Sequence, residues 1–184
     1  NPGIEPVEKL SNESLKEAEK ILKDKSPRLI TVSRYDKRKS HDKIIMALRN
    51  LKQVYPNIIY TSIGYGEEEE NVKKLTKELD LNKQVLFLKN ISLELKNALV
   101  AKSHVFVMPS IIYKKSVEGF GIAYVEAAQF GVPSIGGKDG GAADAIKHNE
   151  TGLICDGKSL DEIYSSIDLI LKNNSYKEFG IKAK

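Results

Sequence analysis

The sequence predicts an α/β domain built on an open parallel sheet of about six strands, with helices on both faces. Six short apolar runs recur along the chain, each compact and mostly without polar alternation, as in strands buried on both sides. Longer segments between them carry apolar residues every three or four positions, which indicates amphipathic helices. Because strands and helices that alternate in this way form right-handed βαβ units, the sheet is predicted to be Rossmann-like.

The predicted strands have in common a short apolar core next to turn residues: RLITVS (28–33), NIIYTSI (57–63), QVLFL (84–88), HVFVMP (104–109), VPSIG (132–136) and GLIC (152–155). The predicted helices have apolar residues on one face and lie at about 11–23, 44–51, 72–79, 122–130 and 160–170, with a short one after Gly141. His41 and Asp42 are expected to begin a helix and not to take part in catalysis.

Composition limits the class of protein. Of the 184 residues, 41% are hydrophobic and 29% charged, which is typical of one soluble globular domain. No apolar run approaches the roughly 20 residues of a membrane span. The one cysteine, Cys155, excludes an internal disulfide and favours a reducing compartment, so a cytoplasmic location is predicted. The net charge of +4 is spread over helices in which lysine and glutamate alternate, which favours solvated surfaces over nucleic-acid binding.

The segment EGFG stands before a predicted helix and contains the strongest candidate site. In open parallel sheets, ligands lie beyond the carboxyl ends of the strands. Gly119 and Gly121 let the backbone turn and leave N–H groups uncovered at the positive helix end, which suits an anion. Glu118 and Glu126 would lie roughly 12 Å apart along a continuous helix, and such carboxylates can bind vicinal hydroxyls. A helix cap and a surface glutamate are the alternative.

Two further segments carry charge or glycine at strand ends. In SRYDKRKSHD, Arg34 and Lys39 could neutralise a diphosphate, with Lys37 and Arg38 nearby; each charge-assisted bond contributes about 1.5–3 kcal/mol. A merely solvated loop is the alternative. In GGKDGG, the N–H groups of 140–141 either face the same anion or form a tight turn.

Some cofactors have no matching motif. GYGEEEE contains two glycines, but Glu69 stands where a dinucleotide fingerprint needs the third, so no NAD site is predicted. The sequence has no D-x-D or HExxH motif and no Cys/His cluster, so no metal or other cofactor is expected. Cations and helix ends would then neutralise a leaving phosphate.

Taken in order, these segments resemble the C-terminal, nucleotide-sugar-binding domain of retaining glycosyltransferases with two Rossmann-like domains (the GT-B type), in particular glycosyltransferase group 1 and mannosyltransferases. EGFGIAYVE is similar to the Glu, seven residues, Glu signature of that family, and the resemblance covers residues 1–180 approximately. Ser40 stands where the family usually has glycine, and Ala143 and Asp144 replace a frequent Pro-Glu pair.

The resemblance implies roles for individual residues. Donor binding would involve the following nine: Arg34, Lys39, Gly64, Ile91, Glu118, Gly119, Phe120, Gly121 and Glu126. Among these, Arg34 and Lys39 would contact the diphosphate and take part in catalysis together with Glu118, which would bind sugar hydroxyls. Glu126 would hold the ribose and Ile91 would meet the nucleobase. The glycines and residue 120 would offer backbone N–H groups.

The resemblance also implies a place in a larger enzyme. Residues 1–10 would end an interdomain linker and 11–184 would form the donor-binding domain, without the N-terminal acceptor domain and the closing C-terminal helix. The donor would be a UDP- or GDP-sugar, with GGKDGGAADA more similar to GDP-mannose enzymes, and the acceptor a glycan or lipid-linked molecule, at or near the inner membrane face. The fragment alone is expected to be inactive. A non-catalytic nucleotide-sugar-binding module is the alternative.

Overall fold

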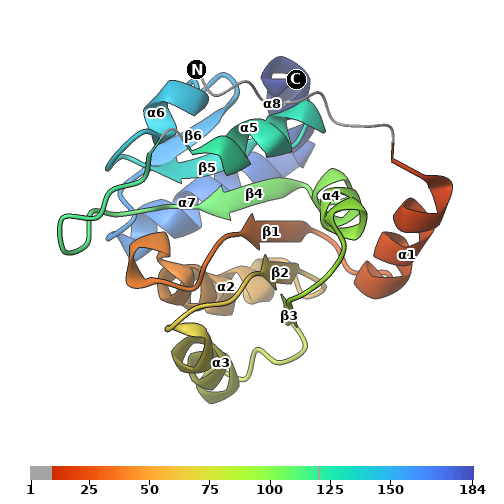
Figure 1. Ribbon diagram of the computed structural model, residues 1–184, viewed down its shortest axis with the longest axis horizontal. Helices are drawn as coiled ribbons and strands as arrows, with labels where there is room; N and C mark the ends of the chain where they lie inside the picture. Colours follow the sequence, from red (N-terminus) through yellow and green to blue (C-terminus); the bar gives the residue numbers. More distant parts are fainter. Residues whose placement is uncertain (1–9, 120) are drawn as a thin grey trace.

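The computed structural model describes residues 10–119 and 121–184 and has one six-stranded parallel sheet in the order β3-β2-β1-β4-β5-β6 (Figure 1). The strands are β1 (Arg28–Val32), β2 (Ile59–Ile63), β3 (Val85–Leu88), β4 (Val105–Met108), β5 (Ser134–Gly137) and β6 (Gly152–Cys155). Each lies within or within one residue of a predicted run. The predicted Rossmann-like fold is confirmed.

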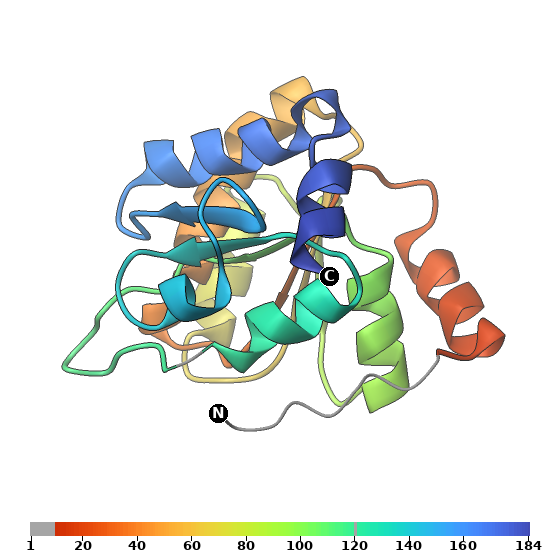
Figure 2. The same ribbon diagram turned by 90° about the horizontal axis from the view of Figure 1, so that it is seen from above.

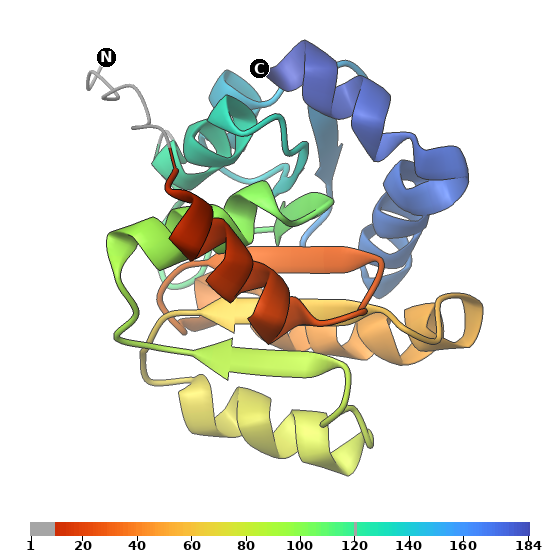
Figure 3. The ribbon, with the colours of Figure 1, turned by 90° about the vertical axis from the view of Figure 1, so that its right-hand side faces the viewer.

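Helices cover both faces of the sheet. They are α1 (Asn12–Leu22), α2 (His41–Val54), α3 (Glu69–Glu78), α4 (Leu93–Ala101), α5 (Ile122–Gln129), α6 (Ala142–Ala145), α7 (Leu160–Leu171) and α8 (Tyr176–Ala183), with short 3₁₀ turns at Lys37–Lys39 and Lys172–Asn174. Figure 3 shows α1 and α4 on one side of the sheet and α7 on the other. As predicted, α2 begins at His41.

Two hydrophobic cores result from this arrangement, one under α2, α3 and α7 and one under α1, α4, α5 and α6. Leu29 and Ile30 are adjacent in β1, are both fully buried, and belong to different cores. Successive strand side chains point to opposite faces, so a strand covered on both faces needs apolar residues at consecutive positions. Cys155 is a small buried residue of the first core, as expected.

Helix α4 was not predicted from the sequence. Its buried residues Leu95, Ala98, Leu99 and Val100 include three consecutive positions, because α4 lies between α1 and the sheet and is contacted on more than one side. Such a pattern has no single apolar stripe. The Ser92 side chain accepts a hydrogen bond from Leu95 N (3.1 Å) and begins the helix.

The linker prediction at residues 1–10 falls almost entirely outside the described residues. Within the described ranges, no helix is long and apolar enough to cross a membrane.

The strand order reverses direction between β1 and β4, and this position determines where loops meet. Chain connections leave β1 toward β2 on one side and β4 toward β5 on the other. A crevice forms at such a switch point, beyond the carboxyl ends of the two strands. Residues 33–40 after β1 and residues 109–119 after β4 therefore meet there, although about eighty positions separate them.

Candidate functional site

A cleft of ≈ 510 Å³ opens at the carboxyl ends of β1 and β4. Its lining comes from the end of β1 and the segment after it, the end of β4, and the segment before α5 with the start of that helix: Val32, Ser33, Arg34, Arg38, Lys39, Met108, Glu118, Gly119, Gly121, Ile122 and Ala123. The fold thus brings five of the predicted site residues to one cleft: Arg34, Lys39, Glu118, Gly119 and Gly121.

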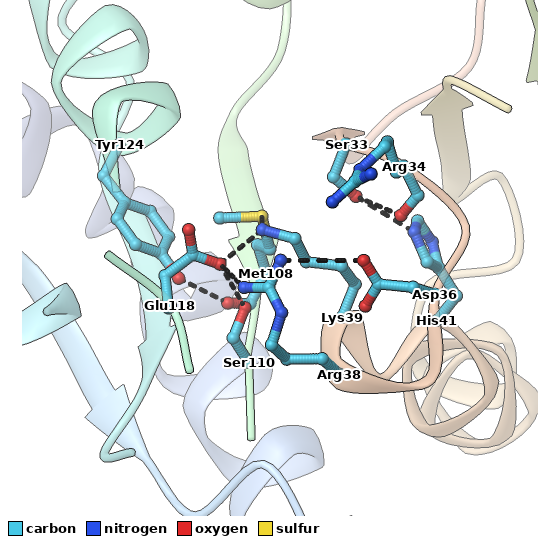
Figure 4. A network of polar contacts seen from close by, with 10 residues as sticks. All are labelled: Ser33, Arg34, Asp36, Arg38, Lys39, His41, Met108, Ser110, Glu118 and Tyr124. Carbon is cyan, nitrogen blue, oxygen red and sulfur yellow. Dashed lines mark hydrogen bonds and ion pairs between the residues drawn. The ribbon is translucent and has the colours of Figure 1, made fainter. Parts of the chain in front are cut away.

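The centre of the cleft is an ion cluster around Glu118 (Figure 4). Its Oε2 atom accepts hydrogen bonds from Arg38 Nη1 (2.6 Å), from Lys39 Nζ and from Ser110 Oγ (3.1 Å). Oε1 makes no hydrogen bond to any other residue that the structure describes. One carboxylate oxygen therefore takes all the internal donors, and the other is left to accept a hydrogen bond from a ligand.

Burial sets the protonation of this cluster. Burial raises the pKa of Glu118, but the hydrogen bond from Lys39 and the charges of Lys39 and Arg38 outweigh burial and hold the pKa below its ordinary value. For Lys39, which is 7% exposed, desolvation lowers the pKa despite the bond to Glu118. The Lys39 ammonium has already lost much of its water, so it can bind an incoming anion with little further desolvation.

A buried histidine, His41, contacts the segment after β1 (33–40), which carries the cations of the cleft. His41 is 2% exposed, and its Nε2 and Nδ1 atoms lie 3.0 Å from Ser33 Oγ and 3.1 Å from Tyr60 OH. Tyr60 in turn donates to Thr31 Oγ1 (2.9 Å). Desolvation lowers the pKa of His41 to about 4, so the ring is neutral at pH 7. This polar chain joins the segment to β1 and β2.

Glycine at two positions allows the segment after β4 to reach its place. Gly121 has φ +72°, and a Cβ on it would lie 2.4 Å from the Tyr124 ring. The Tyr124 hydroxyl donates to Met108 O (2.6 Å), which fixes α5 against β4. Gly140 has φ +98°, and the next residue, Gly141, donates its N–H to Glu118 O (3.0 Å). Of the two alternatives for residues 140–141, the anion site is therefore wrong for this N–H, because it already holds the Glu118 backbone, and the turn is the one observed.

The start of α5 faces the cleft. Ile122 and Ala123 are its first two residues and line the cleft. The first N–H groups of a helix have no carbonyl partner within it, and they favour negative charge. Together with exposed Arg34 and with Lys39, they make this cleft suitable for a phosphorylated ligand.

Three other predicted residues do not line this cleft. Glu126 pairs with Lys96 of α4 at 3.1 Å, and its side chain is 40% exposed; Figure 2 shows α4 and α5 next to each other. Ile91 is partly buried against the second core. Gly64 is a packing position, where a Cβ would lie 1.9 Å from Ser33 O. Phe120 lies outside the described residues.

The spacing estimate for the two glutamates does not apply, because α5 begins at Ile122 and residue 118 precedes it. Sequence reasoning also missed three hydrogen-bond donors: Arg38 and Ser110, which bind Glu118, and Lys96, which binds Glu126. Arg38 was visible only as one cation in a basic run, and nothing in the sequence indicated Ser110 or Lys96. Among the residues that the structure describes, no group of three or more His, Cys, Asp or Glu could hold a metal ion.

The family model for glycosyl transferases group 1 matches residues 13–184. A mannosyltransferase of Mycolicibacterium smegmatis, named as GDP-mannose-dependent alpha-(1-6)-phosphatidylinositol monomannoside mannosyltransferase, is 32% identical over 161 residues, which are 86% of this chain and 42% of the relative. The chain spans about two fifths of the length of the curated relatives it matches first.

Two solved structures show the same fold at 20% identity. The C-terminal domain of the group 1 glycosyl transferase LpcC from Francisella tularensis has a TM-score of 0.81, over 98% of this chain and 94% of that one. Anabaena HepE, solved in complex with UDP and glucose, has a TM-score of 0.80, over 94% of this chain and 47% of that one.

Proposed function

Because this chain belongs to the glycosyl transferases group 1 family, we propose that it is the donor-binding domain of a glycosyltransferase and binds a nucleoside-diphosphate sugar in the cleft between β1 and β4. One observation carries the proposal: Glu118 is fixed by Lys39 and Arg38 beside the open N-terminus of α5. A sugar diphosphate needs both a group that binds hydroxyls and a cationic environment for its phosphates, and the cleft offers both.

In the proposed complex, Lys39, Arg34 and the first N–H groups of α5 contact the diphosphate. Glu118 Oε1, which is not used internally, accepts hydrogen bonds from the sugar hydroxyls. As the glycosidic bond breaks, negative charge grows on the departing phosphate, and fixed positive groups stabilise it most at that point. We propose a retaining transfer in which the acceptor attacks on the leaving-group face, without a protein nucleophile and without a metal ion.

The nucleoside would extend along α5 toward Glu126 for the ribose and Ile91 for the base. Glu126 is half-exposed and pairs with Lys96 at 3.1 Å, so a ribose diol would share this carboxylate with a lysine. A carboxylate has acceptor positions on both oxygens, and Lys96 contacts only Oε2. Glu126 can therefore accept from a ribose without losing Lys96.

For the donor, we favour GDP-mannose over UDP-sugars. The relative in M. smegmatis is named for GDP-mannose, whereas HepE, which is less similar in sequence, was solved with UDP. The acceptor would be a glycan or a lipid-linked molecule, bound mainly by a second domain, with the full-length enzyme in the cytoplasm or at the inner membrane face. The 184-residue chain alone would bind the donor and transfer nothing.

Calorimetric titration of the chain with GDP, UDP, ADP, GDP-mannose and UDP-glucose, with and without EDTA, tests the proposal. We expect saturable binding of one nucleotide class, unchanged by EDTA, and at least tenfold weaker binding in Lys39→Ala and Glu126→Ala, since each loses a charge-assisted contact worth about 1.5–3 kcal/mol. Lys37→Ala is the matched control, because Lys37 is exposed and does not line the cleft. Equal affinity in all three variants would contradict the assignment.

A further inference from the structure

The cluster around Glu118 contains one more cation than a single carboxylate needs. Arg38 and Lys39 both bind Oε2, and the side chains of the three residues are only 9–12% exposed. Buried charges are costly unless they are paired, so a second buried cation beside one carboxylate needs a reason. Arg38 has a second carboxylate within reach, because its Nη2 lies 3.6 Å from Asp36 Oδ2. The charges alternate along the row Asp36, Arg38, Glu118, Lys39.

The two cations differ in how firmly they are held. Arg38 lies between two carboxylates, and its own carbonyl accepts a hydrogen bond from Ile111 N (2.8 Å), so its side chain and backbone are both fixed. Lys39 stands at the end of the row, where its other neighbour is Met108 Sδ at 3.4 Å, a weak acceptor. An ammonium has three donors on a flexible stem. Lys39 is therefore the cation that can turn to a diphosphate.

We infer that Arg38 is a positioning residue that keeps Glu118 ionised and in place when the donor diphosphate draws Lys39 away from it. This inference rests on the proposed function and assigns a role to a residue that contacts Glu118, not the reacting atoms. With Arg38 present, Glu118 keeps a charged partner throughout binding. Its free Oε1 then stays available for the sugar while Lys39 serves the phosphate.

Without Arg38, Lys39 would have to serve two anions. If Lys39 turned to the diphosphate, Glu118 would keep only the neutral donor Ser110, in a place where its side chain is 12% exposed. Such a carboxylate binds a proton, because burial without a positive partner favours the neutral form. Donor binding would then take up a proton and weaken as the pH rises.

Few other groups could produce this pH dependence. The segment after β1 contributes Asp36, Arg38 and Lys39 to the surroundings of Glu118, with Arg34 on the cleft wall. From α5, Tyr124 faces the carboxylate, but burial raises the pKa of Tyr124 above its ordinary value, so the hydroxyl stays protonated. The end of β4 contributes Met108 and Ser110, which do not titrate. Of the described groups at the cleft, Glu118 is the carboxylate that would lose its charged partners if Arg38 were absent and Lys39 turned away.

The test is calorimetric titration with GDP-mannose and with UDP-glucose at pH 5.5 to 8, since a diphosphate bridge does not itself titrate in this range. We expect the wild-type affinity to change less than about twofold, and that of Arg38→Gln to fall about tenfold or more from pH 5.5 to 8, as one linked proton allows up to tenfold per pH unit. Arg38→Lys keeps the positive charge, so its donor affinity should change as little with pH as that of wild type. Lys37→Gln, which changes an exposed cation next to it, should match wild type.

A second measurement does not depend on how the variants fold. Titration of the wild-type chain in two buffers of different ionisation enthalpy should show no net proton uptake, and uptake of about one proton would overturn the inference. So would a flat profile in Arg38→Gln, or loss of its binding at every pH while its circular dichroism stays native, since Arg38 would then contact the donor itself. If wild type binds neither sugar nucleotide, the proposed function fails first.

Discussion

His41 Nε2 lies 3.0 Å from Ser33 Oγ, so a buried imidazole supports the segment that carries the cations of the cleft. The ring is buried, and desolvation lowers its pKa from 6.5 to about 4. A histidine that must stay neutral to stay buried couples folding to pH. The same contact therefore stabilises the segment and makes it sensitive to acid.

The first prediction concerns this coupling. Between pH 6.5 and about 4, the unfolded chain binds a proton at His41 that the folded chain does not. The free energy of unfolding that depends on neutral His41 is therefore fully present above pH 6.5 and falls as the pH is lowered. The expected loss is on the order of 3 kcal/mol, at about 1.36 kcal/mol per pKa unit. Urea unfolding of wild type and His41→Gln at pH 7 and 4.5 measures it.

In that experiment the difference in free energy of unfolding between wild type and His41→Gln should be smaller at pH 4.5 than at pH 7. His148→Gln is the comparison variant, since it removes an exposed histidine that lies outside the segment after β1 and bridges to Gly152. If the difference in free energy of unfolding between wild type and His41→Gln is the same at both pH values, His41 is not kept neutral by the fold.

The second prediction concerns Ser40, which has φ +54° and ψ +35°, a left-handed conformation that disfavours any side chain with a Cβ. Its buried hydroxyl also has no hydrogen-bond partner among the described residues. Ser40→Gly should therefore raise the free energy of unfolding by about 1 kcal/mol, since the left-handed penalty is roughly 1–2 kcal/mol and glycine loses some of that gain through its flexible unfolded state.

Ser40→Ala separates the two effects, because it removes the hydroxyl and keeps the Cβ. We expect thermal unfolding to rank Ser40→Gly above Ser40→Ala, and Ser40→Ala close to wild type. If alanine stabilises as much as glycine, the unpaired hydroxyl and not the backbone conformation is responsible.

The third prediction compares two glycines of EGFG. Gly121 has φ +72° and lies where a Cβ would meet the Tyr124 ring at 2.4 Å, whereas a Cβ on Gly119 would meet no atom within 4 Å. Gly121→Ala should lower the free energy of unfolding by about 1–3 kcal/mol through strain and overpacking. Gly119→Ala should change it by less than about 0.5 kcal/mol.

Chemical denaturation measures both variants. Because Gly121→Ala displaces Tyr124 and the start of α5, it should also weaken nucleotide binding. Equal stabilities of the two variants would mean that the turn before α5 can rearrange at no cost.

The fourth prediction concerns the charge of Glu118. Glu118→Gln keeps the shape but leaves Arg38 and Lys39 without their shared anion, so the free energy of unfolding at pH 7 should fall by about 1–3 kcal/mol. The pKa of Glu118 is held below its ordinary value in the folded state, so its stabilisation is present at neutral pH and is lost as the pH falls through the folded pKa.

Denaturant unfolding at pH 7 and at pH 3.5 should therefore show that wild type and Glu118→Gln differ strongly in free energy of unfolding at neutral pH and less in acid. Glu67→Gln, at an exposed glutamate, should differ from wild type at neither. A difference that grows in acid would reverse the sign assigned to Glu118.

Much of the fold could be predicted because it depends on local patterns. Apolar pairs such as Leu29 and Ile30 identify a strand covered on both faces, and the glycines of EGFG mark the start of α5. Helix α4 could not be found in this way, since its burial comes from α1 and the sheet together. Predicted boundaries were also too long at several strand ends, where pairing with neighbours stops before the apolar run does.

The site divides in the same way. The sequence by itself determined the class of fold, the edge of the sheet at which the candidate site lies, and the residue types available there, because hydrophobic periodicity and glycine positions act over a few residues. Only the tertiary structure decided that Arg38 joins Lys39 on one oxygen of Glu118, that Gly141 is already used, and that Lys96 holds Glu126. These contacts join positions 23 to 80 residues apart, so their geometry depends on how the strands and helices are placed in the fold.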